Sequence, residues 1–298
     1  MNGEGFGRTG SVWVYGVIAI IIHSLWGGNT VAVKFSLLAF PPMWTAFFRF
    51  LLGVLCIFLW AKLNNIRIWP SRRELSLLLL LSVLFTVQIG TMNTGIDLST
   101  GSISAILMAT NPLFAACFTH FMLPDDHLTP LKTLGLVVAF AGTGLVLLQT
   151  SNLDSLQLFN LGNWILLFSA ALLGLRLAYS AQLVRNIDPV RVIIWQMAFS
   201  LPLFALGGAL FESISWDKIG WQPLAGLLYQ GVVIAGLGFM VNTYMIKLYR
   251  PSVIVSFNFV SPISGVLLSM WLLNEPLTWQ LLIGMLTVGL GLYLIARR

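Results

Sequence analysis

The chain carries one pattern twice: residues 109–135 read ATNPLFAACFTHFMLPDDHLTPLKTLG, and residues 259–284 read FVSPISGVLLSMWLLNEPLTWQLLIG. Each stretch places a proline, Pro112 or Pro262, in the middle of an apolar segment and follows it with an acidic turn. Each then continues with Leu-Thr at the start of the next apolar segment and ends on a glycine. The two prolines are 150 residues apart in a chain of 298 residues. The sequence therefore indicates two similar halves.

The composition indicates that most of the molecular surface faces lipid. Of all residues, 58% are hydrophobic and 9% are charged, and the mean hydropathy is +0.90. Soluble domains carry about 25% charged residues. In lipid every backbone N–H and C=O must be bonded within the protein, which leaves helices or closed barrels. The long unbroken apolar runs favour helices, because barrel strands alternate in polarity.

Ten apolar segments are long enough to cross a membrane, since a helix needs about 20 residues to span the hydrocarbon. The first one is kept as a span because no small-residue cleavage site of a signal peptide follows it. The expected spans are residues 12–38, 43–61, 74–92, 102–123, 130–149, 161–184, 190–210, 223–248, 252–272 and 277–296.

A second set of paired residues supports the duplication. At an offset of 147 residues the pairs are Gly27 with Gly174, Asn29 with Arg176, Pro42 with Pro189, and Arg49 with Gln196. Each half holds five spans, an odd number, so the halves must have opposite orientations. The predicted fold is an all-α polytopic membrane protein of ten transmembrane helices, arranged as two inverted five-helix repeats in residues 1–150 and 151–298. Many secondary transporters are built in this way and bind substrate at the midplane.

The positive charges predict the orientation. If the N-terminus is cytoplasmic, only Lys218 lies in a loop on the opposite side, and Lys34, Arg49 and Arg176 lie within spans. The positive-inside rule therefore predicts cytoplasmic termini. We assign the net charge of +6 to this topology rather than to nucleic-acid binding, because the basic residues are scattered singly. Those on the cytoplasmic side are Arg8, Lys62, Arg67, Arg72, Arg73, Lys132, Arg185, Arg191, Lys247, Arg250, Arg297 and Arg298.

Acidic residues are absent from the interior of the expected spans, and the sequence contains no catalytic motif. All ten Asp and Glu residues fall in loops, tails or span ends. Cation extruders commonly need a buried carboxylate, so the sequence argues against a cation antiporter of the small multidrug resistance type and favours a neutral, zwitterionic or anionic substrate. No hydrolase, metalloprotease or nucleotide-binding motif occurs, and Cys56 and Cys117 lack metal-ligand spacing. We therefore expect no enzyme activity, no metal and no cofactor.

Several polar residues within the spans are candidates for a substrate site. Arg176 could clamp a carboxylate, or it could snorkel or bind backbone carbonyls. Pro112 and Pro262 leave carbonyls four residues earlier without their helical partner, and a substrate ammonium or a neighbouring hydroxyl could bind there. Lys34 and Arg49 are expected to snorkel or anchor their spans. The expected substrate-binding residues are Trp26, Asn29, Gln88, Met108, Asn111, Arg176, Tyr179, Tyr229, Asn258 and Ser261, with Pro112 and Pro262 as hinges; for the polar ones, hydrogen bonding between helices is the alternative role.

The sequence resembles a known family over nearly its whole length. SLWGGNTVAVK at residues 24–34, FFRFLLG at 47–53, NEPLTWQLLIGMLTVGLGLYL at 274–294 and the two mid-span prolines carry the resemblance. They are similar to the EamA branch of the drug/metabolite transporter superfamily, and the chain looks most like its bacterial exporters of aromatic and other amino acids. The resemblance implies a central cavity lined by both halves and amino-acid efflux across the bacterial inner membrane.

The expected function is therefore that of a facilitator-type exporter. It would move aromatic and other small neutral or zwitterionic amino acids by alternating access, through a cavity walled by the first, third, fourth, sixth, eighth and ninth spans. One alternative is a nucleotide-sugar or organic-phosphate antiporter, which would need clustered Lys or Arg where the sequence shows single cations. Another is a membrane scaffold that transports nothing. The expected partners are the amino acid and membrane lipid, with no nucleic acid, and a monomer is compatible with ten spans.

Overall fold

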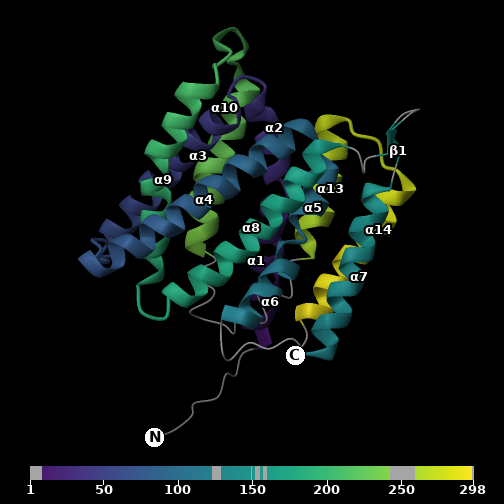
Figure 1. Ribbon diagram of the computed structural model, residues 1–298, viewed down its shortest axis with the longest axis horizontal. Helices are drawn as coiled ribbons and strands as arrows, with labels where there is room; N and C mark the ends of the chain where they lie inside the picture. Colours follow the sequence, from purple (N-terminus) through teal and green to yellow (C-terminus); the bar gives the residue numbers. More distant parts are fainter. Residues whose placement is uncertain are drawn as a thin grey trace, which may run out of the picture.

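The computed structural model describes residues 9–122, 129–148, 150–151, 155–156, 160–241 and 259–296, and these residues are almost entirely helical (Figure 1). The first repeat contributes α1 (Thr9–Gly27), α2 (Asn29–Leu37), α3 (Pro42–Leu63), α4 (Arg72–Leu98), α5 (Gly101–Met108), α6 (Asn111–Met122) and α7 (Pro130–Leu147). The second contributes α8 (Leu161–Leu183), α9 (Pro189–Phe211), η2 (Trp216–Lys218), α10 (Trp221–Leu228), the π-helix η3 (Tyr229–Gly238), α13 (Val260–Leu273) and α14 (Trp279–Ala296).

The expected architecture of ten helices is confirmed, and residues 242–248 of the eighth expected span and 252–258 of the ninth lie outside the described residues. Within the described residues eight helical segments are long and apolar enough to cross a membrane, and α13 and α14 are two shorter apolar helices. Three spans are not uniform α-helices: the first breaks between α1 and α2, the fourth between α5 and α6, and the eighth changes from α10 to a π-helix. Between the halves, β1 (Thr150–Ser151) and β2 (Ser155–Leu156) form a short antiparallel hairpin that the sequence analysis did not predict.

The repeated motifs begin equivalent helices in the two halves. Pro42 and Pro189 are the first residues of α3 and α9, where the missing N–H of proline has no helical partner to lose. Thr129 accepts a hydrogen bond from Lys132 N at 3.3 Å, and Thr278 accepts one from Leu281 N at 3.2 Å. The repeated Leu-Thr is thus the N-cap of the last helix of each half.

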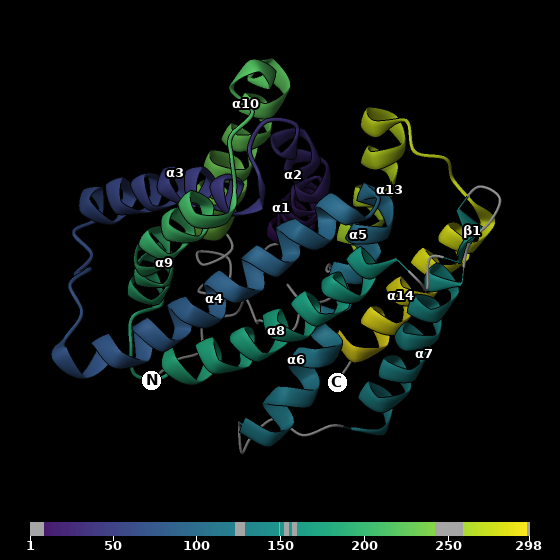
Figure 2. The ribbon, with the colours of Figure 1, turned by 45° about the horizontal axis from the view of Figure 1, so that its top comes forward.

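Helices α7 and α14 lie side by side, as Figures 1 and 2 both show, and their contacts reveal a two-fold relation. A methyl group on Gly142 would lie 2.9 Å from the carbonyl oxygen of Gly284, and one on Gly135 would lie 2.7 Å from that of Gly291. Gly284 and Gly291 follow Gly135 and Gly142 by 149 residues, so each contact is the repeat copy of the other. Only an interface with two-fold symmetry exchanges its contacts in this way.

A second pair of contacts obeys the same symmetry. The last turn of α1 packs at Gly27 against α13, where a methyl group would lie 2.8 Å from Gly265 N. Gly174 of α8, the repeat copy of Gly27, packs against α6, where a methyl group would lie 2.6 Å from Ala115 N. Gly265 is in turn the copy of Ala115, at the offset of 150 residues seen for the prolines. The first helix of each half therefore packs against the fourth span of the other half in an equivalent way.

Candidate functional site

A cavity of about 430 Å³ lies among helices of both repeats. Its described lining comes from the six spans that were expected to wall it, the first, third, fourth, sixth, eighth and ninth, and also from α3, the second span, which was not expected. Most lining residues lie several positions from the ends of their spans, so the cavity occupies the interior of the bundle. Seven of the ten expected substrate-binding residues line it: Trp26, Asn29, Gln88, Met108, Asn111, Arg176 and Ser261.

The other three expected residues do not line the described cavity. Tyr179 packs in a separate apolar cluster and donates a hydrogen bond to Leu77 O at 3.4 Å, so it lies away from the described cavity. Tyr229 is also displaced, because its hydroxyl donates to Leu25 O at 2.7 Å and joins the eighth span to the first. Asn258 lies outside the described residues. Of the expected hinges, Pro112 lines the cavity, whereas Pro262 is buried in α13 and does not.

The break in the fourth span follows from three neighbouring residues. Thr110 bonds back to Leu107 O through its hydroxyl at 2.6 Å, which competes with helix continuation. Pro112 has no N–H to offer Met108 O, and the side chain of Asn111 supplies the missing bond at 2.7 Å. The sequence analysis proposed that a substrate ammonium or a neighbouring hydroxyl could bind Met108 O. That carbonyl already accepts a hydrogen bond from the Asn111 amide.

Broken and π-helical segments meet at the cavity. Asn29 begins α2 at the cavity, directly after the Gly27-Gly28 break, and Met108 and Asn111 flank the break between α5 and α6. Ile234 of the π-helix η3 adds a third irregular segment. Non-helical backbone at membrane depth is tolerated where protein or a water-filled cavity surrounds it, and transporters commonly place their substrate sites there.

Two arginines lie in the cavity wall. Arg176 of α8 and Arg49 of α3 are 8% and 5% exposed. The guanidinium carbon of Arg176 lies 4.7 Å from the centre of the Phe85 ring, and that of Arg49 lies 4.9 Å from the centre of the Phe50 ring. The two rings meet edge to face, with centroids 4.6 Å apart. The sequence analysis expected single, separate cations and an anchoring role for Arg49, whereas the structure brings both cations to one aromatic pair.

A buried amide network holds the Arg49 side of the cavity. Gln230 of η3 donates to Ala32 O at 3.1 Å and to Ser36 Oγ at 2.7 Å, which fixes it against α2. Its Oε1 accepts a long bond of 3.5 Å from Arg49 Nη1. Gln88 of α4 donates to Ser169 Oγ of α8 at 3.2 Å, and its buried Oε1 has no hydrogen-bond partner among the described residues. These bonds join η3 to α2 and α4 to α8 beside the cavity.

Two carboxylates cap helices at one end of the bundle. Glu275, in the turn after α13, accepts from the backbone N–H groups of Gly101 and Ser102 at 2.6 and 2.8 Å. Glu212, directly after α9, accepts from Met43 N at 3.0 Å at the start of α3. Burial raises the pKa of Glu212, and the backbone donors partly offset this shift. Both carboxylates lie at N-termini, where the helix dipole favours a negative charge.

Lys34 lies at the same end of the bundle, and the sequence analysis expected it to snorkel or anchor its span. Its Nζ donates to Asp97 O at 3.1 Å, which ties α2 to the last turn of α4.

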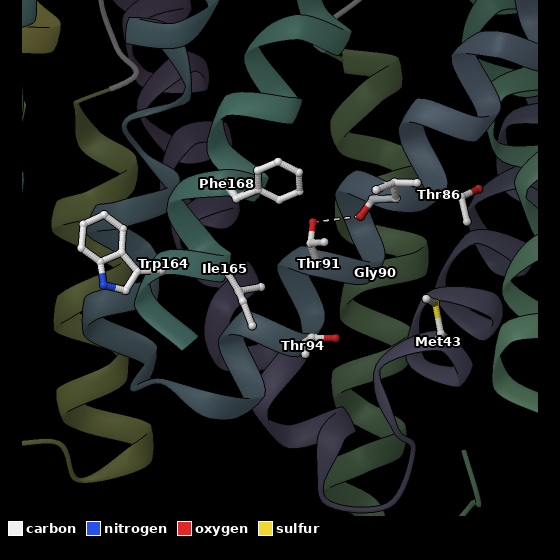
Figure 3. A pocket seen from close by; sticks show the side chains of 9 residues that line it. Met43, Thr86, Gly90, Thr91, Thr94, Trp164, Ile165 and Phe168 are labelled. Atoms are coloured by element: carbon white, nitrogen blue, oxygen red, sulfur yellow. Dashed lines mark hydrogen bonds between the residues drawn. The ribbon is translucent and has the colours of Figure 1, made fainter. Parts of the chain in front are cut away.

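A second hollow, of about 530 Å³, lies outside the bundle between α4 and α8 (Figure 3). Trp164, Ile165 and Phe168 form one side of it, and Thr91 faces them. Trp164 and Phe168 are about half exposed on the surface that faces lipid. Thr91 donates to Val87 O at 2.8 Å, so its hydroxyl is already bonded. This groove is an apolar surface feature, whereas the central cavity gathers the polar groups.

Within the described residues no group of three or more His, Cys, Asp or Glu side chains could hold a metal ion.

Comparison with known proteins agrees with this architecture. The model of the EamA-like transporter family matches residues 14–148 and again residues 160–297. The chain belongs to the EamA-like transporter family. It is 21% identical over 281 residues to the uncharacterized transporter YoaV of Bacillus subtilis (strain 168), with 94% of each chain covered. It is 24% identical over 264 residues to the uncharacterized inner membrane transporter YedA of Escherichia coli (strain K12), with 86% of this chain and 82% of YedA covered.

A solved crystal structure shows the same fold, with a TM-score of 0.67 and 18% identity over 96% of both chains. This EamA-family chain is therefore a multi-pass membrane transporter built from two repeats. The names of these relatives specify no solute.

Proposed function

We propose that this transporter exports small amino acids, aromatic ones among them, across the inner membrane of a bacterium by alternating access through the central cavity. The observation that supports this best is the cavity itself, which lies between the two repeats and combines aromatic walls with a few polar side chains. Ligand sites are typically clefts of about 300–1,000 Å³ that are mostly apolar, with a small number of placed polar groups. A cavity of about 430 Å³ falls within this range.

Individual residues fit the parts of an aromatic amino acid. Trp26, Phe50 and Phe85 offer aromatic surface, and Arg176 offers a guanidinium that matches a carboxylate bidentately. Asn29 Oδ1 and Gln88 Oε1 are buried acceptors without a hydrogen-bond partner among the described residues, and they can accept from the ammonium group. The cavity can therefore hold both ends of a zwitterion.

The membrane setting forms part of the proposal. The distribution of Lys and Arg supports cytoplasmic termini. The relative YedA carries the description inner membrane transporter, which supports the same location for this chain. We expect the chain to work as a monomer surrounded by lipid, without nucleic acid and without a cofactor.

The test is uptake into liposomes that contain the purified full-length chain. Labelled aromatic and small neutral amino acids are offered singly, with and without a pH gradient, and protein-free liposomes are the control. Saturable uptake of aromatic amino acids is expected, and a gradient effect would reveal proton coupling. If no amino acid enters faster than into protein-free liposomes, the proposal is wrong.

A pair of variants links uptake to the central cavity. Ala109→Trp places a large side chain in the cavity, and Thr91→Trp places the same side chain in the lipid-facing groove of Figure 3. We expect Ala109→Trp to lower uptake at least tenfold and Thr91→Trp to leave it within twofold of the unmodified chain. Equal uptake by the two variants would show that the solute does not pass through the cavity.

A second candidate is the exchange of organic phosphates or nucleotide sugars. The observation that favours it is that Arg49 and Arg176 line one cavity, because guanidinium groups bind phosphate as well as carboxylate. Counterflow in the same liposomes separates the two functions: amino acids exchange for amino acids under the first, and phosphates for phosphates under the second.

A further inference from the structure

Two buried positive charges in the cavity wall lack a negative partner. Among the described residues Arg176 makes no hydrogen bond and no ion pair, and its Nε is buried without a partner. Arg49 has only the long bond from Nη1 to Gln230, and its Nε is likewise unpartnered. Their contacts with Phe85 and Phe50 supply a cation–π attraction. That attraction is weaker than the desolvation penalty of burying an ion without a counter-charge.

The described carboxylates lie outside the cavity lining. Glu275, Glu212 and Asp188 accept hydrogen bonds from backbone N–H groups at the starts of helices, Asp97 lies at the last turn of α4, and Asp217 lies in η2. Glu74 pairs with Arg191 at 2.8 Å at the opposite end of α4. The described lining of the cavity contains no Asp or Glu. The wall therefore presents two positive charges and no compensating negative charge.

A zwitterion would leave this imbalance unchanged, because its ammonium group cancels its carboxylate. A solute with a net negative charge would reduce the imbalance and supply hydrogen-bond acceptors for the guanidinium donors. Asn29 Oδ1 and Gln88 Oε1 are neutral acceptors, so they can orient a solute without altering the charge of the wall.

We infer that the solute carried through this cavity is an organic anion, whose planar oxyanion group is held jointly by Arg49 and Arg176 while its apolar body lies against Trp26, Phe50 and Phe85. This inference rests on the proposed transport through the cavity and replaces the zwitterionic amino acid of that proposal by a solute with a net negative charge. Among compounds related to amino acids, it selects those with one more negative than positive charge, such as N-acylated or acidic amino acids.

The test compares solutes that share one aromatic ring and differ in charge. Liposomes with the purified chain are offered labelled L-phenylalanine, N-acetyl-L-phenylalanine and phenylalanine amide at neutral pH, which carry net charges of 0, −1 and +1. Phenyl phosphate replaces the carboxylate by a phosphate in a fourth arm. We expect N-acetylphenylalanine to enter at least about tenfold faster than phenylalanine, because both carry the carboxylate but only phenylalanine brings an ammonium group next to the two guanidinium charges. We expect an inside-positive membrane potential to accelerate its entry.

Arginine variants test whether Arg176 and Arg49 determine the preference for a negatively charged solute. Arg176→Gln and Arg49→Gln should each reduce the preference for N-acetylphenylalanine over phenylalanine at least fivefold. The matched control is Lys62→Gln, which removes an exposed cation from α3 and should leave the preference unchanged. The comparison among solutes uses the unmodified chain, so the inference stays testable even if an arginine variant does not fold.

The outcomes separate the inference from the proposed function. Faster entry of N-acetylphenylalanine or phenyl phosphate than of phenylalanine supports the inference, and the faster of the two identifies the preferred oxyanion. Entry of phenylalanine at an equal or higher rate overturns the inference and leaves amino-acid export standing. If N-acetylphenylalanine enters and no free amino acid does, the inference holds and the export of zwitterions is wrong. If none of the four solutes enters, both are wrong.

Discussion

Replacing Gly142 by alanine tests the two-fold contact between α7 and α14. The new methyl group would lie 2.8 Å from Val288 N, 2.9 Å from Gly284 O and 2.9 Å from Thr287 Cβ. Ordinary contacts of a methyl carbon are about 3.5–4.0 Å, so the helices must separate by roughly half an ångström. Overpacking of this kind costs about 1–3 kcal/mol, and the better helix propensity of alanine returns up to about 1 kcal/mol. The expected net loss of stability is about 1–2 kcal/mol.

The matched control lies two residues further along the same helix. A methyl group on Gly144 would meet nothing within 4 Å, so Gly144→Ala should leave stability unchanged or raise it by up to about 1 kcal/mol. The repeat copy of Gly142 is Gly291, where a methyl group would lie 2.6 Å from Gly135 O. The symmetry therefore predicts that Gly291→Ala is as harmful as Gly142→Ala.

The assay is thermal unfolding of the purified variants in detergent. At roughly 2 °C per kcal/mol for a chain of this size, Gly142→Ala and Gly291→Ala should each unfold about 2–6 °C below Gly144→Ala. Equal melting temperatures for all three variants would refute the close crossing of α7 and α14.

Three further predictions follow from single contacts. Pro112→Leu restores an N–H donor at the break between α5 and α6, and Pro262→Leu restores one in α13. Each variant should reduce export severalfold and should elute like the unmodified chain in size-exclusion chromatography. Undiminished transport by both variants would refute the hinge hypothesis. Glu275→Gln removes the charge from the cap of α5 and should cost about 1–2 kcal/mol, measured as a lower melting temperature. Glu74→Gln breaks the partly exposed pair with Arg191 and should cost less than about 1 kcal/mol in the free energy of unfolding, so a larger loss would contradict the small contribution expected of this pair.

The spans were predictable because lipid requires long apolar helices. Their duplication was predictable because glycines and prolines recur at equivalent positions in the two halves. A helix in lipid needs a long apolar run, so hydropathy locates the spans, although the third span continues to Leu98, six residues past its predicted end. The repeated glycines and prolines lie where helices cross or begin, and those positions tolerate few other residues. Gly27 and Gly174 show this clearly, since each packs against the repeat copy of the other's partner.

The placement of side chains around the cavity was less predictable, because it depends on how each helix is rotated. The spans show little amphipathic contrast from which a rotation could be read. Arg49 therefore received an anchoring role, although it lies in the wall, and Tyr179 was placed at the site, although it packs elsewhere. One available signal was the pairing of Arg49 with Gln196 and of Arg176 with Asn29 across the repeats. All four positions are polar, and polar residues at equivalent depths in both halves are expected near the symmetry axis.

The π-helix η3 had no signal in the sequence. Its residues are as apolar as those of an ordinary span, and its hydrogen-bond pattern depends on the neighbours that pack around it.

The central claim is that solute passes through the cavity between the repeats. The most direct measurement is the transport rate of a chain with a single cysteine at Asn111, in a background where Cys56 and Cys117 are serine, before and after modification by a small thiol reagent. We predict that modification abolishes transport and that the transported solute slows the modification, whereas a single cysteine at the exposed position of Lys62 is modified without effect. Full transport after complete modification at position 111 would contradict the claim.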